Sequence, residues 1–293
     1  MILVIGATGL LGGEICRRLA ATGRPIRALV RPTASETRVE NLKALGVTLV
    51  QGDLKDRASL DAACQGTAAV ITTASTTLSR QPGDSIQTVD LEGQVRLIDA
   101  AKTARVQQFI YVSFSHHIDV DCPLTTAKRT VEAHLKRSGL TYTILAPTFF
   151  MEVWLSPALG FDAGKGTAQI YGSGANKIGW ISLRDVAQFA VDCLDNPAVR
   201  NATIELGGPE ALSPLEVVRC FEETGGRKFR VEHVPEETLN AQKAAAADPF
   251  QRTFAALMLS YAHGDSIDMR MTLQKFPISL LSVREYARRT VRA

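Results

Sequence analysis

Short β-branched runs alternate with longer helical stretches through the first half of the chain, and this alternation restricts the fold more than any other feature. The stretches between the runs are ten or more residues long and have helical character. Strands that alternate with helices form right-handed βαβ units, and strands as apolar as these are covered on both faces. The pattern therefore predicts an α/β fold with a doubly wound parallel sheet. The runs occupy residues 2–5, 26–30, 47–51, 69–73, 109–113 and 141–145.

The rhythm changes after residue 150. Glycines become frequent over residues 160–179, and sequences typical of helix N-termini begin at Ser182, Ser213 and Ser282. In each, the serine can accept a hydrogen bond from the N–H three residues on, and the acid there can reach back. We expect one domain over residues 1–150 and a smaller, mostly helical region over residues 151–293. Strands near 168–171 and 203–206 are expected to rejoin the main sheet.

Composition and charge exclude several classes of protein. The 293 residues include 33 basic and 30 acidic side chains, which gives a net charge of +3. This balance is too even to predict a nucleic-acid-binding protein, which needs a concentrated basic surface. No apolar run approaches the ~18 residues that a membrane-spanning helix requires. The N-terminal segment lacks the pattern of a secretory signal, so we expect a cytoplasmic protein.

The five cysteines are scattered along the chain, and none of them forms a C-x-x-C pair. This is typical of reduced thiols and predicts neither a disulfide framework nor a zinc site. No metal ion is therefore expected among the cofactors.

A glycine-punctuated turn follows the first strand, where the sequence reads GATGLLG over residues 6–12. A phosphate approaches a backbone closely only where no Cβ intervenes, and free N–H groups and the positive end of a helix then hold it. Gly6 ends the strand, Gly9 admits a pyrophosphate, and Gly12 lets the helix lie close to the sheet. This is the Rossmann fingerprint in a strand–turn–helix context. It predicts a dinucleotide site that also includes Thr8, Leu10 and Leu11.

The residue after the second strand indicates which dinucleotide binds. A ribose 2′-hydroxyl favours an acidic residue at this point, and a 2′-phosphate favours an arginine. Arg31 stands there, and no acid occurs from residue 24 to residue 35. We therefore predict NADP(H) rather than NAD(H), with a solvated surface arginine as the alternative. Asp53, followed by Leu54, lies just past the third strand, where it can accept from the adenine amino group or cap a helix.

Further ligand-facing positions are expected at the carboxyl ends of the fourth and fifth strands, because ligands bind outside that edge of an open α/β sheet. Small side chains there fit the close approach of a cofactor ribose, although they are equally common in buried strands. The residues are Thr72, Thr73 and Ala74 after the fourth strand and Ser113 after the fifth.

The segment PTFFMEVW (147–154) follows the sixth strand at the same predicted edge. Its first residues are expected to line the nicotinamide side of the cofactor, namely Pro147, Thr148 and Phe149. Its larger apolar side chains are expected to offer surface to a flat substrate, together with Phe114; they are Phe150, Met151 and Trp154. Ordinary core packing is the alternative for these aromatic residues.

Several segments together resemble the NmrA-like branch of the atypical short-chain dehydrogenases. This branch includes isoflavone-reductase-like enzymes, NADPH-dependent quinone reductases and redox-sensing regulators. The resemblance covers about residues 1–225 and implies a Rossmann core, NADP(H) and a substrate cleft beside the C-terminal part. The segments are GATGLLG (6–12), RALVRP (27–32), GDL (52–54), FIYVSF (109–114), KRTVEAHLKRSGLTYTILAPTFFME (128–152) and ISLRDVAQFA (181–190).

The resemblance also bears on catalysis. In the wider superfamily, a tyrosine four residues before a lysine donates a proton to a carbonyl oxygen, and the lysine lowers its pKa and binds the nicotinamide ribose. Residues at this spacing share one face of a helix. Here Lys128 occupies the lysine position, but Leu124 stands in place of the tyrosine and cannot transfer a proton. Lys128 lies beside the apolar stripe of its helix, where it can reach into a cleft or pair with Glu132.

His116 and His117 follow the fifth strand at its carboxyl end. Either one could replace the absent acid, because the unperturbed pKa of histidine lies near neutrality. A solvated position in the loop is the alternative for each. Adjacent side chains diverge and no carboxylate–histidine spacing accompanies them, so the pair predicts no metal site.

These observations lead to three hypotheses. The first is an NADPH-dependent reductase of a small apolar carbonyl, quinone or enone, with Lys128, His116, His117 or water as the proton source. The second is a non-catalytic NADP(H)-binding redox sensor with a protein partner, which the absence of the tyrosine favours. The third is an assembly protein of a membrane complex, for which the basic last helix would face a partner.

Overall fold

The structure is a computed structural model that describes residues 1–78 and 80–292 of the chain. The chain folds into two compact units, which we call unit 1 and unit 2. Unit 1 comprises Met1–Ser113, Leu124–Ala146 and Val186–Ile204, and unit 2 comprises Phe114–Pro123, Pro147–Asp185 and Glu205–Ala293.

Unit 1 is built on a seven-stranded sheet with the order β3–β2–β1–β4–β5–β6–β10. The five strand pairs from β3 to β6 are parallel, and Ile2 of β1 is in register with Ile26 of β2 and Ala69 of β4. This order, with the crossover between β3 and β4, is that of the doubly wound dinucleotide-binding fold, so the predicted fold class is confirmed. The strands are β1 (Ile2–Ile5), β2 (Ile26–Val30), β3 (Thr48–Gln51), β4 (Ala69–Thr72), β5 (Gln108–Val112), β6 (Tyr142–Pro147) and β10 (Ala202–Leu206).

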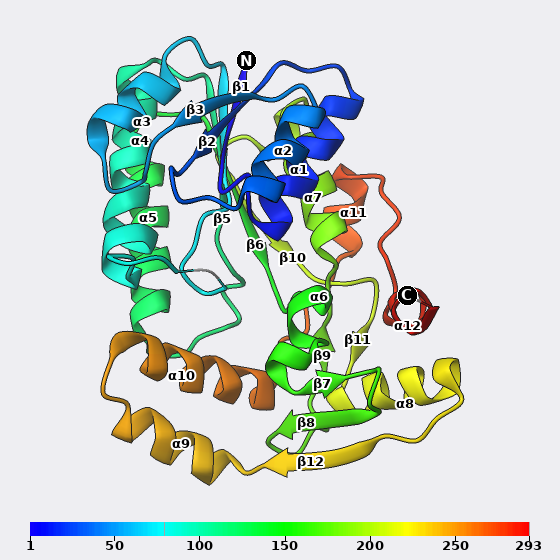
Figure 1. The fold of residues 1–293 in the computed structure, drawn as a ribbon. Coiled ribbons are helices and arrows are strands. Elements are labelled where there is room, and N and C mark those ends of the chain that lie inside the picture. Colours follow the sequence, from blue (N-terminus) through cyan, green and yellow to red (C-terminus); the bar gives the residue numbers. More distant parts are fainter. Residues whose placement is uncertain (79, 293) are drawn as a thin grey trace. The chain divides into compact units, whose positions relative to one another are not determined.

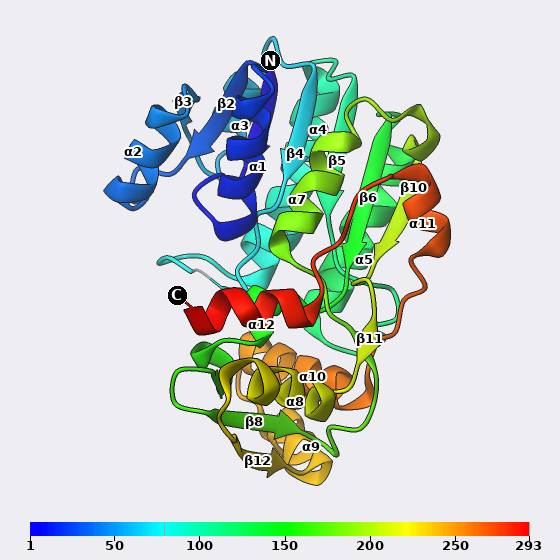
Figure 2. The ribbon, with the colours of Figure 1, turned by 90° about the vertical axis from the view of Figure 1, so that its right-hand side faces the viewer.

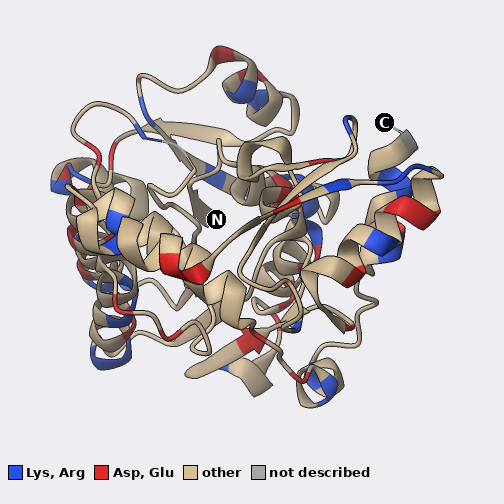
Figure 3. Ribbon diagram, turned by 90° about the horizontal axis from the view of Figure 1, so that it is seen from below, with Lys and Arg blue, Asp and Glu red and all other residues tan. Residues whose placement is uncertain are grey.

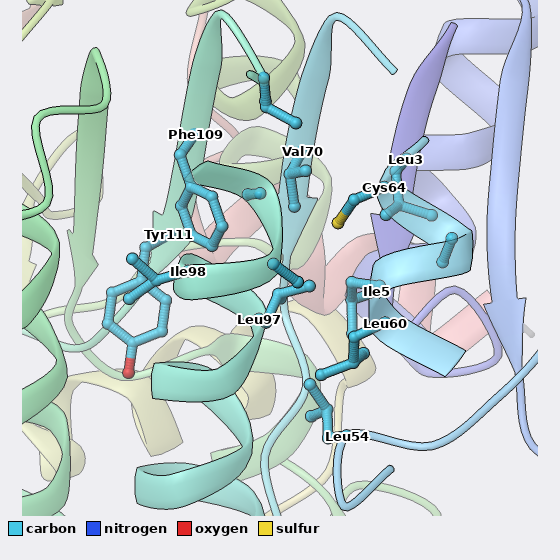
Figure 4. Close-up of a cluster of buried hydrophobic side chains, with 14 of the residues drawn as sticks. Leu3, Ile5, Leu54, Leu60, Cys64, Val70, Leu97, Ile98, Phe109 and Tyr111 are labelled. Atoms are coloured by element: carbon cyan, nitrogen blue, oxygen red, sulfur yellow. The ribbon is translucent and has the colours of Figure 1, made fainter. Parts of the chain in front are cut away.

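Helices cover both faces of this sheet (Figure 1, Figure 2). One face packs against α3, α4 and α5, and the apolar core between them includes Leu60, Leu97 and Val131. Phe109 and Tyr111 point from β5 into the same core, beside Leu97 and Ile98 (Figure 4). The opposite face packs against α1 and α7. The helices are α1 (Leu10–Ala21), α2 (Glu36–Ala44), α3 (Arg57–Cys64), α4 (Gln94–Thr103), α5 (Pro123–Arg137), α7 (Leu183–Asp192) and the 3₁₀ turn η3 (Pro197–Val199).

A π-helical segment, η1 (Ile86–Gly93), leads directly into α4. Its N-terminus has a capping box, in which Ser85 Oγ accepts from Thr88 N and Thr88 Oγ1 accepts from Ser85 N. π-helical turns are rare and occur frequently at functional sites. In this chain the segment places Asp90 in the interior of unit 1, where its side chain is fully buried.

Unit 2 contains two small sheets. β8 pairs in parallel with β12 and antiparallel with β7, and β9 pairs antiparallel with β11. Both edges of β8 are therefore occupied, and this strand lies outside the main sheet that it was expected to rejoin, whereas β10 does lie in that sheet. The strands are β7 (Phe161–Asp162), β8 (Thr167–Tyr171), β9 (Ile178–Gly179), β11 (Ala211–Leu212) and β12 (Arg230–Val234).

The helices of unit 2 bury a second apolar cluster with these sheets, in which Trp180, Phe221 and Met258 are almost wholly buried. The predicted capping pairs are present at Ser213 with Glu216 and at Ser282 with Glu285. The helices are α6 (Met151–Trp154), the 3₁₀ turn η2 (Pro157–Leu159), α8 (Pro214–Gly225), α9 (Glu236–Ala245), α10 (Pro249–His263), α11 (Arg270–Lys275) and α12 (Val283–Arg292).

Basic and acidic residues are interspersed in the structure. Figure 3 shows lysines and arginines distributed over the ribbon with aspartates and glutamates between them. Within the described ranges, no helix combines the length and apolar character needed to cross a bilayer.

Candidate active site

The glycine turn of unit 1 has the geometry of a phosphate cradle. Gly6 adopts a positive φ of +82°, and Gly9 N donates to Gly6 O over 2.9 Å. A Cβ on Gly12 would lie 2.2 Å from Gly6 O, so only glycine allows α1 to lie this close to the turn. Gly9 is the N-cap of α1 and supplies no side-chain acceptor to the first turn. The N–H groups at this end of α1 are thus oriented to hold an anion.

The end of β4 lies against the same turn. A Cβ on Gly6 would lie 2.7 Å from Thr73 Oγ1 and 3.0 Å from Ala74 N. Thr72 is fully buried, and its hydroxyl donates to Gln94 Oε1, while Gln94 Nε2 donates to Ala74 O. The structure therefore brings the predicted cofactor residues of the first and fourth strands together, and Gln94 fixes the backbone between them.

The turn exposes part of its predicted contact surface. Gly9 and Leu10 are exposed, Thr8 is half-buried, and Leu11 lies in the interior. The guanidinium of Arg38, on α2, donates to Thr8 O over 2.7 Å. The sequence reasoning did not select Arg38. Arg38 is 30 residues from Thr8 in the sequence, and the two residues meet only in the folded chain, so no local pattern indicates this contact.

Arg31 lies directly after β2, and its charge is already engaged. Its Nη1 atom donates to Asp84 Oδ2 over 2.6 Å, so it is not simply a solvated surface arginine. Asp53 Oδ1 accepts from Lys55 N, and Asp53 Oδ2 pairs with Lys55 Nζ. The N-cap of α3 is Asp56, whose side chain accepts from Ala58 N. The helix-cap alternative for Asp53 is therefore wrong.

Leu54 belongs to the apolar core of unit 1 and is 6% exposed. Its Cβ would be 2.9 Å from a Cβ on Gly93, so the residue packs closely against the π-helical segment. Its side chain contributes to packing in this structure.

Lys128 is buried in unit 1 on α5. Its Nζ atom lies 3.5 Å from Val112 O at the carboxyl end of β5, 3.9 Å from Asp90 Oδ1, and 5.1 Å from the centre of the Tyr111 ring. Burial lowers the pKa of Lys128, although the nearby Asp90 and Glu132 carboxylates act to raise it. An ammonium with a lowered pKa gives up its proton more readily than an ordinary lysine does.

Glu132 is bound by other partners. Ser113 Oγ donates to Glu132 Oε1 over 2.5 Å, and Arg129 Nη1 donates to the same atom over 2.6 Å. The ion pair described for Lys128 is with Asp90, and not with the Glu132 that the helical spacing suggested. Ser113 and Lys128, which the sequence placed on different elements, thus belong to one buried polar cluster.

Two members of this cluster escaped the sequence reasoning. Asp90 Oδ2 accepts from Thr76 N and Thr76 Oγ1, whereas Asp90 Oδ1 has no hydrogen-bond partner within the described part of the chain. The Tyr111 hydroxyl, drawn in Figure 4, is likewise buried without a partner there. Burial, with Asp90 and Glu132 nearby, raises the pKa of Tyr111 far above its usual value. Unsatisfied buried polar atoms are uncommon in native proteins and often mark functional sites.

In unit 2, each of the two predicted histidines faces a carboxylate. His116 Nδ1 is hydrogen-bonded to Glu205 Oε1 over 2.5 Å, and His117 Nδ1 lies 3.5 Å from Asp265 Oδ1. Asp265 is buried, and its Oδ2 atom accepts from the Thr148 hydroxyl over 2.8 Å. Burial raises the pKa of Asp265 in spite of hydrogen bonds from Thr148 and Ser115.

The segment after β6 is more deeply packed than expected. Phe149 is 2% exposed and Met151 has no exposed surface, so both side chains belong to the core of unit 2, as does part of Trp154. Trp154 meets Phe149 edge to face at 4.7 Å and stacks on Tyr261 at 5.3 Å. Met151 therefore offers a substrate no surface in this structure.

The remaining residues of this group lie at the margin of the same core. Pro147 O accepts from Ser115 N, which joins the two segments of unit 2 that follow β5 and β6. Phe150 O accepts from Trp154 N, and Phe114 is half-buried against the core. Over residues 1–78 and 80–292, no three acidic, histidine or cysteine side chains gather in a way that could bind a metal ion.

Comparison with known proteins identifies the family. The NmrA-like family model matches residues 1–275. The chain belongs to the NmrA-like family. Lys128, Ser113 and the glycine turn all lie within the matched part of this family member, as do Asp90, Tyr111 and Asp265.

Three relatives illustrate the range of the family. An NAD(P)H azoreductase of Xenophilus azovorans is 33% identical over 78% of this chain and 76% of its own length. A photosystem II assembly factor, Ycf39, of Cyanophora paradoxa is 32% identical over 80% of this chain and 71% of its own. A chloroplast protein of Arabidopsis thaliana, named for a high-chlorophyll-fluorescence phenotype, is 30% identical over 83% of this chain, but the match spans only 60% of that relative.

A solved structure shows the same fold over the whole chain. The NADPH-dependent quinone oxidoreductase of Escherichia coli, solved with NADPH, superposes with a TM-score of 0.80. It is 23% identical, and the superposition covers 99% of each chain.

Proposed function

We propose that this family member is an NADPH-dependent reductase of a small apolar carbonyl, quinone or enone. The observation that carries the proposal is the glycine turn, where a Cβ on Gly12 would overlap Gly6 O and where α1 begins without a side-chain cap. A fold alone does not imply an activity, so the proposal depends on this site and on the buried lysine.

The residues of unit 1 fit a nicotinamide dinucleotide phosphate. The N–H groups at the start of α1 would hold the pyrophosphate, and Arg31 would contact the 2′-phosphate. Thr72, Thr73 and Ala74 would lie along the ribose, with Asp53 near the adenine. The azoreductase and the quinone oxidoreductase among the similar proteins carry NAD(P)H or NADPH in their names, which supports the same cofactor here.

Lys128 would supply the proton. A bound NADPH provides a hydride, and the substrate oxygen that gains negative charge then needs an acid in place of the missing tyrosine. The Lys128 ammonium lies beside the carboxyl end of β5, the edge at which such sheets bind ligands. Its lowered pKa brings the proton closer to transfer at neutral pH. Ser113, held by Glu132, would help to orient the oxygen.

In unit 2, Pro147, Thr148 and Phe149 remain the proposed nicotinamide contacts, and Phe114, Phe150 and Trp154 the proposed apolar substrate contacts. His116 and His117 remain alternative proton donors, and the ring of each lies beside a carboxylate.

The test is NADPH oxidation with a panel of quinones, enones and aromatic aldehydes, followed at 340 nm. We expect the wild type to turn over at least one class of substrate. Loss of this turnover in Lys128→Met, with turnover retained in His116→Asn and His117→Asn, supports Lys128 as the proton donor. Binding of NADPH without turnover of any substrate in the panel would contradict it.

A second function is supported by a separate observation. Leu124 replaces the usual tyrosine, and an assembly factor of photosystem II is 32% identical to this chain. A protein of this type would bind NADP(H) and a protein partner without reducing anything. Such a sensor requires different affinities for NADPH and NADP⁺, because a ligand bound equally in both states shifts no equilibrium. Calorimetry with both forms tests this, and equal dissociation constants would contradict it.

A further inference from the structure

Asp84 lies in the segment between β4 and η1, and it is almost fully enclosed by cationic partners. Its side chain is 1% exposed. Oδ2 accepts from Arg31 Nη1 over 2.6 Å and from Gln81 N over 2.9 Å, and Oδ1 accepts from Lys55 Nζ over 2.5 Å. One carboxylate therefore binds both basic residues that follow β2 and β3.

The charges in this group cancel. Lys55 also pairs with Asp53 at 3.0 Å, so Arg31 and Lys55 face Asp53 and Asp84, two positive charges against two negative ones. Burial by itself would raise the pKa of Asp84, but the hydrogen bonds from Lys55, Gln81 N and Arg31 outweigh it, and the net shift is downward. Asp84 is therefore ionised at neutral pH and keeps its hold on both cations.

A second contact joins the loop after β2 to the segment that contains Asp84. The Thr33 hydroxyl is hydrogen-bonded to the Gln81 side chain, and Gln81 Nε2 donates to Thr33 O over 3.2 Å. The segment around Asp84 is thus tied to the loop after β2 by side chains and backbone together. In a dinucleotide-binding sheet this loop contacts the adenosine ribose.

We propose that Asp84 is the residue that limits the preference for NADPH over NADH. This inference rests on the proposed function. A 2′-phosphate that binds Arg31 and Lys55 shares these cations with Asp84, and it approaches the negative charge of the Asp84 carboxylate as it does so. A ribose 2′-hydroxyl needs neither cation and can donate to a carboxylate. Asp84 therefore weakens NADPH binding selectively and leaves NADH binding almost unchanged.

The test is calorimetric binding of NADPH and NADH to the wild type and to Asp84→Asn. Asparagine keeps an acceptor for Gln81 N and removes the charge. We expect the dissociation constant for NADPH to fall by about tenfold, and that for NADH to change by less than about twofold. Adenosine 2′,5′-bisphosphate and 5′-AMP, measured as fragments, should show the same difference without the nicotinamide end.

Two further variants isolate the cause. Asp56→Asn removes the negative charge that caps α3, where the Asp56 carboxylate accepts from Ala58 N, so it should leave the ratio of the NADPH and NADH dissociation constants unchanged. When Asp84→Asn is added to the Arg31→Ala variant, the affinity for NADPH should rise by less than about threefold, because the Arg31 guanidinium is already absent. Thermal unfolding of the free variants checks that each one is folded.

The outcomes separate the two claims. A wild type that binds neither coenzyme contradicts the proposed function. The wild type could also bind both coenzymes while Asp84→Asn has the same ratio of NADPH to NADH dissociation constants as the wild type. This result leaves the proposed function intact and overturns the role of Asp84. Equal weakening of both coenzymes in a folded Asp84→Asn variant also overturns it, because Asp84 would then only hold the loop.

Discussion

The Nζ atom of Lys128 lies 3.9 Å from Oδ1 of Asp90 in the interior of unit 1, and both side chains are buried. The distance is too long for a strong charge-assisted hydrogen bond, which is shorter than about 3 Å. Asp90 therefore acts on Lys128 mainly through its charge. It opposes the desolvation that lowers the pKa of the ammonium, and so it favours the protonated form of Lys128.

Replacing Lys128 should abolish catalysis while leaving the fold intact. Positioned acids contribute on the order of 10²–10⁴-fold to rates, so we expect kcat of Lys128→Met to fall by at least about 100-fold. Lys136→Met, an exposed lysine on the same helix, is the matched control and should keep the wild-type rate. Steady-state kinetics measure both, and a Lys128→Met variant with near-normal kcat would exclude this lysine as the donor.

Asp90→Asn should move the pH dependence of the reaction. An acid must be protonated, so activity is lost as pH rises through the pKa of Lys128. Removing the Asp90 charge takes away an interaction that raises this pKa. The decline in kcat should then begin about one pH unit lower or more, since an opposite charge within 4–6 Å shifts a pKa by roughly 1–3 units. Asp99→Asn, on the partly exposed Asp99–His134 pair of α4 and α5, serves as control. Identical pH profiles for Asp90→Asn and the wild type would show that Asp90 does not act on the donor.

Gly12→Ala and Gly13→Ala form a matched pair in α1. The Cβ of an alanine at residue 12 would lie 2.2 Å from Gly6 O, whereas at residue 13 it would lie 3.4 Å from Ala7 O. We expect Gly12→Ala to lose NADPH binding by at least about 100-fold and to lower the free energy of unfolding, because the turn must open. Gly13→Ala should bind normally and gain up to about 1 kcal/mol from helix propensity. Urea unfolding and calorimetry measure both effects, and equal behaviour of the two variants would be inconsistent with a tight turn.

Glu216 gives unit 2 a pH-dependent contribution to stability. Hydrogen bonds from Lys177 and from Ser213 N lower the pKa of Glu216 from 4.5 to about 2. A lowered carboxyl pKa stabilises the folded state above pH 4.5, and the contribution is lost as pH falls toward 2. Because the side chain is 35% exposed, solvent screening reduces the effect, and we expect Glu216→Gln to cost about 1 kcal/mol at pH 7.

The cost of Glu216→Gln should shrink between pH 4.5 and pH 2. Denaturant unfolding at several pH values measures it, with the exposed Glu210→Gln as control. A cost that stays constant down to pH 2 would show that the carboxylate charge is not what stabilises the cap of α8.

The sequence predicted those parts of the site that depend on neighbours along the chain. The strand alternation, the Gly6–Gly12 turn and the position of Arg31 after β2 all follow from local patterns, and the main sheet has the order they require. The helical spacing of apolar residues in α5 also predicted that Lys128 lies beside the apolar stripe, and Lys128 is buried in the structure. Local spacing was misleading for Lys128 and Glu132, because partners from other elements bind each of them.

The remaining contacts could not be predicted because they join distant segments. Asp84 is 53 residues from Arg31, and Asp265 is 117 residues from Thr148. Asp90 lies buried in a π-helical segment, and no propensity pattern in the sequence specifies such a segment. Tertiary packing decides these contacts.

The central claim is that the glycine turn of unit 1 holds the pyrophosphate of NADPH with Arg31 at the 2′-phosphate. A crystal structure determined with millimolar NADPH tests it most directly. We expect pyrophosphate oxygens within hydrogen-bond distance of the backbone N–H groups at the start of α1, and the 2′-phosphate in contact with Arg31. Crystals in which the nucleotide is absent from this turn, or is bound elsewhere on the protein, would contradict the claim.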